Sequence, residues 1–233
     1  MKILITGGSG LLGSNLIKLL EKDHQIFAPT HNEVDVSNLT SLSSYITFSQ
    51  PDVVIHCAAI AKFAIAENKP FETINTNVIG TCNITKVCML NNIRMVYIST
   101  SHVFDGKEGN YKPTDKVNPL TIYAKSKVAG EMVTLMYSNS LVIRTEFCEE
   151  TFPFDTAYDD KFSSKEYIDI LAPRIAEKCI SEQTGTCHVG GPRRSFYEFG
   201  KLRNPNVKRG SVKDLVSQSK VPILLDTSLI SDI

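Results

Sequence analysis

Three side chains in the middle of the sequence carry groups suited to acid–base chemistry. Tyr123 and Lys127 lie four residues apart in a segment with helical periodicity, which places both side chains on one face of a helix. A phenol has a pKa of about 10, and a neighbouring ammonium group would lower that pKa toward the neutral range. Thr100 ends an apolar run that reads as a strand, and its hydroxyl could donate a hydrogen bond to a substrate carbonyl oxygen. Together these residue types predict an oxidoreductase-type site.

A glycine-rich turn at the start of the chain predicts a binding site for the diphosphate of a dinucleotide. The apolar run Ile3–Ile5 reads as a buried strand, and helical periodicity begins after the glycines. Gly8, Gly10 and Gly13 fit the spacing G-x-G-x-x-G, and Gly7 starts the related spacing G-x-x-G-x-x-G. Such glycines let phosphate approach the backbone at a helix N-terminus, where free N–H groups attract anions.

The position of the tyrosine and lysine strengthens their interpretation. Taken alone, a Tyr-x-x-x-Lys spacing has no functional meaning in most proteins, where the tyrosine packs in the fold and the lysine is exposed to solvent. Here Tyr123 lies on the helix that follows the strand ending at Thr100, downstream of a dinucleotide turn. In that setting Lys127 could also hydrogen-bond the nicotinamide ribose.

Strand-like and helix-like segments alternate along the first 145 residues. Five apolar runs read as strands: residues 3–5, 25–28, 53–55, 95–98 and 141–143. Two helical pieces are expected within residues 61–90 and another at 123–137, then a loop at 147–162, a helix at 167–180 and a strand at 186–189. This alternation predicts an α/β fold with a doubly wound, Rossmann-type parallel sheet and a small C-terminal substrate lobe.

Composition excludes several classes of protein. The chain has 233 residues, 42% of them hydrophobic, which suits one buried domain with a small added lobe. Lysine plus arginine equals aspartate plus glutamate at 25 each, so no nucleic-acid partner is expected. No apolar stretch approaches the roughly 20 residues of a membrane span and no signal-peptide pattern is present, so we expect a cytoplasmic protein without membrane contact. Neither CxxC nor HExxH spacing occurs, and no metal site is expected.

The second predicted strand leaves the choice of dinucleotide open. An acidic side chain at the end of this strand favours NAD, and a basic one favours NADP. The strand runs into Ala28, Pro29 and Thr30, which are neither. Further on, one structural interpretation of Asp35 or Ser37 is that it caps the N-terminus of the next helix.

A series of short motifs runs through the first 145 residues. They are Thr6-Gly-Gly-Ser-Gly-Leu-Leu-Gly13, Asp35-Val-Ser37, Pro51-Asp-Val-Val-Ile-His-Cys-Ala-Ala59, Ser99-Thr-Ser-His-Val-Phe-Asp-Gly106, Tyr123-Ala-Lys-Ser-Lys-Val-Ala-Gly-Glu131 and Arg144-Thr145. In this order they resemble the extended short-chain dehydrogenases/reductases. Within that superfamily the chain is most similar to the dTDP-4-dehydrorhamnose reductase branch of nucleotide-sugar enzymes.

The resemblance implies roles for individual residues. Tyr123 would be the general acid, Lys127 its activator and ribose ligand, and Thr100 the third catalytic residue. The residues implied to bind NADP(H) or NAD(H), besides Tyr123 and Lys127, are Gly7, Ser9, Gly10, Leu11, Leu12, Gly13, Asp35, Val36, Ala58, Ala59 and Asn77. Residues 1–145 would form the NAD(P)-binding core and residues 146–233 a small substrate-binding lobe and tail, partly interleaved with the core.

The resemblance leaves three functions to weigh. The first is an NAD(P)H-dependent reductase of a nucleotide-linked 4-keto sugar in deoxysugar and polysaccharide biosynthesis. The resemblance implies a homodimer. The second is an epimerase or dehydratase of the same superfamily. A dehydratase normally has Asp-Glu after the threonine, whereas this chain has Ser101-His102. The third is a non-catalytic cofactor-binding regulator, because a related branch serves as the regulatory subunit of methionine adenosyltransferase.

Overall fold

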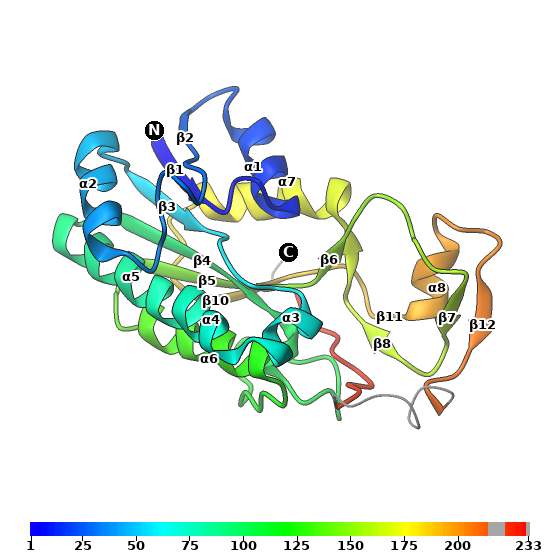
Figure 1. Ribbon diagram of the computed structural model, residues 1–233. Coiled ribbons are helices and arrows are strands. Elements are labelled where there is room, and N and C mark those ends of the chain that lie inside the picture. The colour runs from blue at the N-terminus through cyan, green and yellow to red at the C-terminus, as the bar shows by residue number, and fades with distance from the viewer. Residues whose placement is uncertain (214–221, 232–233) are drawn as a thin grey trace.

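A six-stranded sheet, parallel throughout, forms the centre of the computed structural model, which describes residues 1–213 and 222–231 (Figure 1). The strand order is β10-β5-β4-β3-β1-β2, with each neighbouring pair parallel. The strands are β1 (Lys2–Thr6), β2 (Gln25–Phe27), β3 (Val53–His56), β4 (Arg94–Thr100), β5 (Ser140–Thr145) and β10 (Gly185–Val189). The predicted doubly wound sheet is confirmed. Its edge strand β10 comes from the stretch after residue 145.

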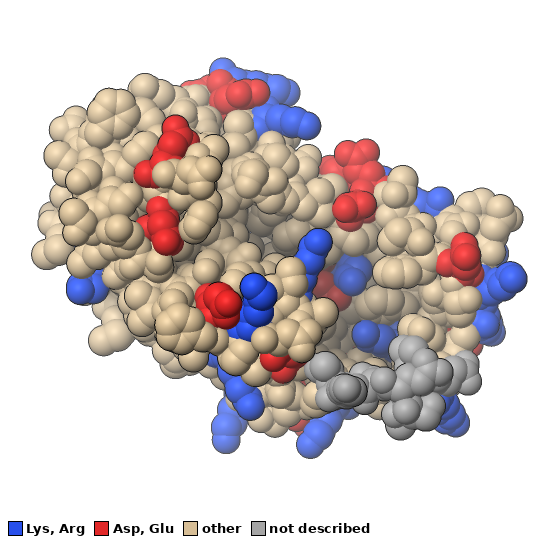
Figure 2. Space-filling model, viewed as in Figure 1, with Lys and Arg blue, Asp and Glu red and all other residues tan. Residues whose placement is uncertain are grey.

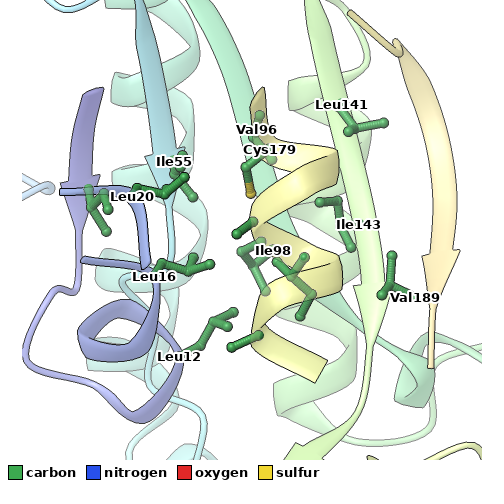
Figure 3. Close-up of a cluster of buried hydrophobic side chains, with 14 of the residues drawn as sticks. Leu12, Leu16, Leu20, Ile55, Val96, Ile98, Leu141, Ile143, Cys179 and Val189 are labelled. Carbon is green, nitrogen blue, oxygen red and sulfur yellow. The ribbon is translucent and has the colours of Figure 1, made fainter. Parts of the chain in front are cut away.

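Helices cover both faces of this sheet. Helices α1 (Leu11–Leu20) and α7 (Ile168–Ile180) pack on one face, and α2 (Leu39–Ser49), α5 (Gly80–Asn91) and α6 (Ile122–Thr134) lie on the other. Figure 3 shows Leu12, Leu16 and Leu20 of α1 beside Cys179 of α7, above apolar side chains of the strands. The sheet is therefore buried on both faces, which explains why its strands are continuous apolar runs in the sequence.

The predicted helical stretch at 61–90 is divided more finely than its periodicity suggests. It consists of α3 (Phe63–Asn68), α4 (Pro70–Thr73), a π-helical turn η1 (Ile74–Ile79) and α5. The π-helical turn contains Asn77, whose amide contacts residues outside the helix. Side-chain partners distant in sequence stabilise this widened turn, so apolar spacing alone does not reveal it.

A small lobe lies beside the sheet layer (Figure 1). It contains α8 (Phe196–Lys201) and the short strands β6 (Phe147–Cys148), β7 (Thr156–Tyr158), β8 (Phe162–Ser163), β9 (Glu166–Tyr167), β11 (Arg194–Ser195) and β12 (Lys208–Gly210). The stretch expected as a loop at 147–162 thus includes β6 and β7. Two parts of the predicted lobe, 214–221 and 232–233, lie outside the described residues. Across the described ranges, no helix combines the length and apolar character that crossing a membrane requires.

A buried histidine joins β1, β3 and α5 at the carboxyl ends of the two strands. His56 Nδ1 lies 2.7 Å from Thr6 Oγ1, and its Nε2 lies 3.1 Å from Thr81 Oγ1. Burial lowers the pKa of His56 to about 3, and the charge of Lys127 contributes to the shift. The imidazole is therefore neutral in the folded protein at pH values where an unfolded chain would protonate it.

This histidine should make the fold sensitive to acid. The folded pKa of about 3 lies below the unfolded value of about 6.5, so the unfolded state binds one more proton between these values. His56 should thus reduce the free energy of unfolding by about 1.4 kcal/mol per pH unit as the pH falls through this window. Urea unfolding at pH 7 and pH 5 measures the difference. In His56→Gln the pH-dependent loss should be smaller by about 2 kcal/mol; an equal loss in both proteins would refute the assignment.

Candidate active site

A cleft of about 650 Å³ opens at the carboxyl ends of the central strands. Its wall is formed by the turn after β1, the segment after β3, the ends of β4 and β5, and the first turns of α6. The predicted site residues that line it are Gly7, Gly10, Leu11, Leu12, Gly13, Ala59, Thr100, Tyr123 and Lys127. The proposed catalytic side chains and most of the glycine turn therefore share one cleft.

The glycine turn is closely packed against itself and against β3. Gly7 has a φ of +70°, and a Cβ there would lie 2.7 Å from the backbone nitrogen of Ala58. A Cβ on Gly13 would overlap the carbonyl oxygen of Gly7. Gly10 begins α1 without a side-chain cap, so the first N–H groups of the helix remain open to an anionic ligand.

Local contacts fix the orientation of α6. The Thr121 hydroxyl accepts a hydrogen bond from the Ala124 backbone nitrogen at 3.1 Å, which caps the helix two residues before Tyr123. At Gly130 the helix passes so close to the Tyr97 hydroxyl that a Cβ would overlap it. This close approach lets Lys127 Nζ donate to the Ile98 carbonyl oxygen at 2.7 Å.

A buried ion pair ties the same helix to the strands beneath it. Arg144 of β5 donates from Nη2 to Glu131 Oε2 at 2.8 Å and from Nε to Oε1 at 3.0 Å. Ser99 of β4 also donates to Glu131. A bidentate guanidinium–carboxylate pair has a defined geometry, so it holds α6 in register with the ends of β4 and β5, where Thr100 lies.

The pKa values of Tyr123 and Lys127 are shifted in opposite directions. Burial raises the pKa of Tyr123 to about 12; a hydrogen bond with Thr100 lowers it, and the charge of Glu146 raises it further. Burial lowers the pKa of Lys127 to about 8, and the charge of Glu131 opposes that shift. The expected lowering of the Tyr123 pKa by Lys127 is not found, because burial dominates and Lys127 bonds the Ile98 carbonyl. The phenol is protonated at neutral pH and can act as an acid.

Several residues implied to bind the cofactor do not line the cleft: Ser9, Asp35, Val36, Ala58 and Asn77. Asn77 accepts from the Ile60 nitrogen at 2.8 Å and donates to Ser126 Oγ at 2.9 Å, so it holds the segment after β3 against α6. The expectation that Asp35 or Ser37 caps α2 is wrong. Asn38 is the cap and accepts from the Ser41 nitrogen at 3.1 Å, while Asp35 Oδ1 binds the Ser37 nitrogen at 2.9 Å.

The structure adds a charged group that the sequence does not single out. Glu146, directly after β5, and Lys165, between β8 and β9, both line the cleft and form an ion pair of 3.2 Å. His102 lines it as well, with Nε2 3.8 Å from Glu146 Oε1. The position of Glu146 after Arg144-Thr145 was the available signal, because residues that follow a parallel strand face the ligand edge of the sheet.

Comparison with known proteins gives the same picture for the first part of the chain. Residues 1–148 match the family model described as the RmlD substrate binding domain. The chain is 35% identical over 150 residues to a dTDP-4-dehydrorhamnose reductase of Aggregatibacter actinomycetemcomitans, covering 63% of this chain and 51% of that protein. It is 32% identical over 142 residues to methionine adenosyltransferase 2 subunit beta of Bos taurus, covering 58% and 42%.

The fold is similar over a longer stretch. A crystal structure of dTDP-4-dehydrorhamnose reductase from Bacillus anthracis, in complex with NADP, superposes with a TM-score of 0.88 at 24% identity. It covers 99% of this chain and 90% of that one. By sequence, in contrast, the match spans about half the length of the curated relatives.

Proposed function

Because the chain belongs to the RmlD substrate binding domain family, we propose that it is an NAD(P)H-dependent reductase of a nucleotide-linked 4-keto sugar, acting in deoxysugar biosynthesis. The observation that carries the proposal is the shared cleft: the glycine turn, Thr100, Tyr123 and Lys127 all line it. The Aggregatibacter relative and the NADP-bound Bacillus structure support this choice of reaction and cofactor.

The glycine turn would hold the cofactor, NADP(H) or NAD(H). The backbone N–H groups of Leu11, Leu12 and Gly13 lie at the start of α1, where they can bind the diphosphate. Lys127 Nζ, at the floor of the cleft beside Ile98, can donate to the ribose hydroxyls. When bound, the reduced nicotinamide supplies the hydride for the reaction.

Tyr123 and Thr100 would act on the oxygen of the substrate carbonyl. As negative charge develops on that oxygen, the Thr100 hydroxyl can donate a hydrogen bond to it. Tyr123, protonated at neutral pH, then transfers its phenolic proton to the same oxygen and completes the alcohol. The Lys127 ammonium lies on the next turn of α6 and bonds the Ile98 carbonyl oxygen, so its role in this site is to hold the cofactor ribose beside the phenol.

The second candidate is a cofactor-binding regulator that does not turn over substrate. The relative that favours it is the Bos taurus methionine adenosyltransferase 2 subunit beta. A regulator needs the glycine turn but not an acid in the cleft. The buried, protonated Tyr123 next to Thr100 therefore favours the enzyme.

The proposal includes three further expectations from the sequence. Residues 146–233 would contribute the substrate side of the cleft, and Phe147 and Lys165 on its lining support this division. The protein would work in the cytoplasm and could form a homodimer. Light scattering after size-exclusion chromatography measures the last of these.

Cofactor oxidation tests the proposed function. Purified protein is mixed with a dTDP- or UDP-linked 4-keto sugar and NADPH or NADH, and the absorbance of the reduced nicotinamide is followed. We expect substrate-dependent oxidation of at least one dinucleotide. Cofactor binding without oxidation by either sugar nucleotide would exclude the reductase and favour the regulator.

A further inference from the structure

The charges on the cleft wall are unbalanced. Of the described residues that line it, Glu146 is the single carboxylate, whereas Lys62, Lys127 and Lys165 each carry an ammonium group. Figure 2 shows lysine and arginine side chains gathered around the hollow between the sheet layer and the lobe. Glu146 can neutralise only one of these ammonium groups. The remaining positive charge favours the binding of an anionic ligand.

The strand order separates Lys165 from the glycine turn. The turn follows β1, whereas Glu146, the partner of Lys165, follows β5, and strands β3 and β4 lie between them. Three inter-strand steps amount to roughly 14 Å. Thr100, at the end of β4, lies between the two positions. A cofactor diphosphate bound at the glycine turn therefore lies too far away to contact Lys165, and Lys165 can bind the substrate instead.

A second ammonium group contacts the same aromatic ring as Lys165. Lys165 Nζ is 4.7 Å and Lys161 Nζ is 4.6 Å from the centroid of the same Phe196 ring. No carboxylate of the described residues forms an ion pair with Lys161. Burial lowers the pKa of Lys161, and the charge of Lys165 lowers it as well, against the effect of Glu146. The charge of Glu146 therefore acts on both ammonium groups, but only Lys165 forms an ion pair with it among the described residues.

The protein itself occupies the oxygens of that carboxylate. Glu146 Oε2 accepts from Ser101 Oγ at 2.7 Å and from Thr227 Oγ1 at 3.2 Å, and Oε1 pairs with Lys165 at 3.2 Å. An ammonium group has three donors, so Lys165, whose side chain is 21% exposed, keeps donors for a ligand. Thr145, the neighbour of Glu146 in the chain, also lines the cleft. Its Oγ1 is buried and has no hydrogen-bond partner among the described residues.

We propose that Lys165 is a specificity-determining residue that binds an anionic oxygen group of the substrate, with Lys161 adding positive charge from its place on the same Phe196 ring. The inference rests on the proposed function, in which the substrate is a nucleotide sugar. The group is either the diphosphate or a carboxylate on the sugar, since an ammonium donor recognises both in the same way. Glu146 holds Lys165 at the cleft wall.

Binding measurements on the cofactor-loaded protein test this role. Calorimetry gives the dissociation constants of dTDP, UDP and glucuronate for the wild type and for Lys165→Met. We expect the variant to bind at least one of these anions at least about tenfold more weakly, equal to about 1.4 kcal/mol, with unchanged cofactor affinity. The matched control is Lys107→Met, because Lys107 is 77% exposed and pairs with Asp105 at 3.7 Å outside the cleft.

The outcomes separate the sources of the anion and the two proposals. Loss of dTDP or UDP binding assigns Lys165 to the diphosphate, and loss of glucuronate binding assigns it to a sugar carboxylate. Equal binding by wild type and Lys165→Met, or no binding of any of the three anions to the wild type, overturns the inference. If anion binding depends on Lys165 but no sugar nucleotide causes cofactor oxidation, the role of Lys165 is retained and the proposed reductase activity is rejected. In turnover, the variant should raise KM with kcat changed by less than about threefold.

Discussion

Replacing Tyr123 with phenylalanine should lower turnover by at least about 100-fold, the usual contribution of a general acid. The ring is buried, and its hydroxyl bonds Thr100 with a pKa raised to about 12, so this phenol is protonated and in place to give its proton to the product oxygen. Removing one oxygen leaves the packing of the ring against Phe63, 5.1 Å away between centroids, unchanged. Steady-state kinetics with reduced dinucleotide and keto sugar measures the effect.

The controls for Tyr123→Phe separate chemistry from binding. Cofactor affinity should stay within about twofold of the wild type, because the change removes transition-state rather than ground-state interactions. Tyr137→Phe, past the end of α6, is the matched variant and should keep full turnover. Turnover of Tyr123→Phe close to that of the wild type would remove Tyr123 from the mechanism.

The second prediction with a large effect concerns binding of the cofactor diphosphate at the glycine turn. Gly10→Ala should weaken cofactor binding at least about tenfold, or about 1.4 kcal/mol, because a Cβ at the N-terminus of α1 would occupy the space of a phosphate. Within the protein, the new Cβ has one neighbour within 4 Å, the Gly7 carbonyl oxygen at 3.2 Å, so the turn must shift by a few tenths of an ångström to accept it. Fluorescence titration with NADPH and with NADH measures the change and also decides between the two dinucleotides.

Gly13→Ala provides the contrast within the same turn. Its Cβ would overlap the Gly7 carbonyl oxygen and approach Gly8 Cα at 2.9 Å, so the substitution should destabilise the fold by about 2 kcal/mol or more. Thermal unfolding should therefore separate a stable Gly10→Ala from an unstable Gly13→Ala. Wild-type cofactor affinity in a folded Gly10→Ala protein would contradict the assignment of the turn to phosphate.

The sequence predicts those parts of the molecule that depend on short-range patterns. The strands of the sheet are apolar because both faces are covered, and the glycine turn is visible because each glycine has a local reason to lack a Cβ. Tyr123 and Lys127 are recognisable for a similar reason, since one helical turn separates them. The predicted fold and the shared cleft follow from these patterns.

Tertiary contacts account for what the sequence does not predict. The pairing of Glu146 with Lys165 requires the lobe to fold back on the end of β5, and no spacing along the chain encodes that contact. The pKa of Tyr123 is set by its burial, with smaller effects of Thr100 and Glu146, and not by the lysine one turn away. Asn77 similarly acts through Ile60 and Ser126, which become its neighbours only in the folded protein.

Transfer of deuterium tests the central claim, hydride transfer from a reduced dinucleotide to the keto carbon of a sugar nucleotide, most directly. The protein is incubated with a dTDP- or UDP-linked 4-keto sugar and reduced nicotinamide dinucleotide that carries deuterium at both C4 positions of the ring. Mass spectrometry and NMR then locate the label. The account predicts one deuterium at C4 of the sugar product in wild type, and the same labelled product formed at least about 100-fold more slowly in Tyr123→Phe. A cofactor that keeps both deuterium atoms, or an epimerised sugar without net oxidation of the dinucleotide, would contradict it.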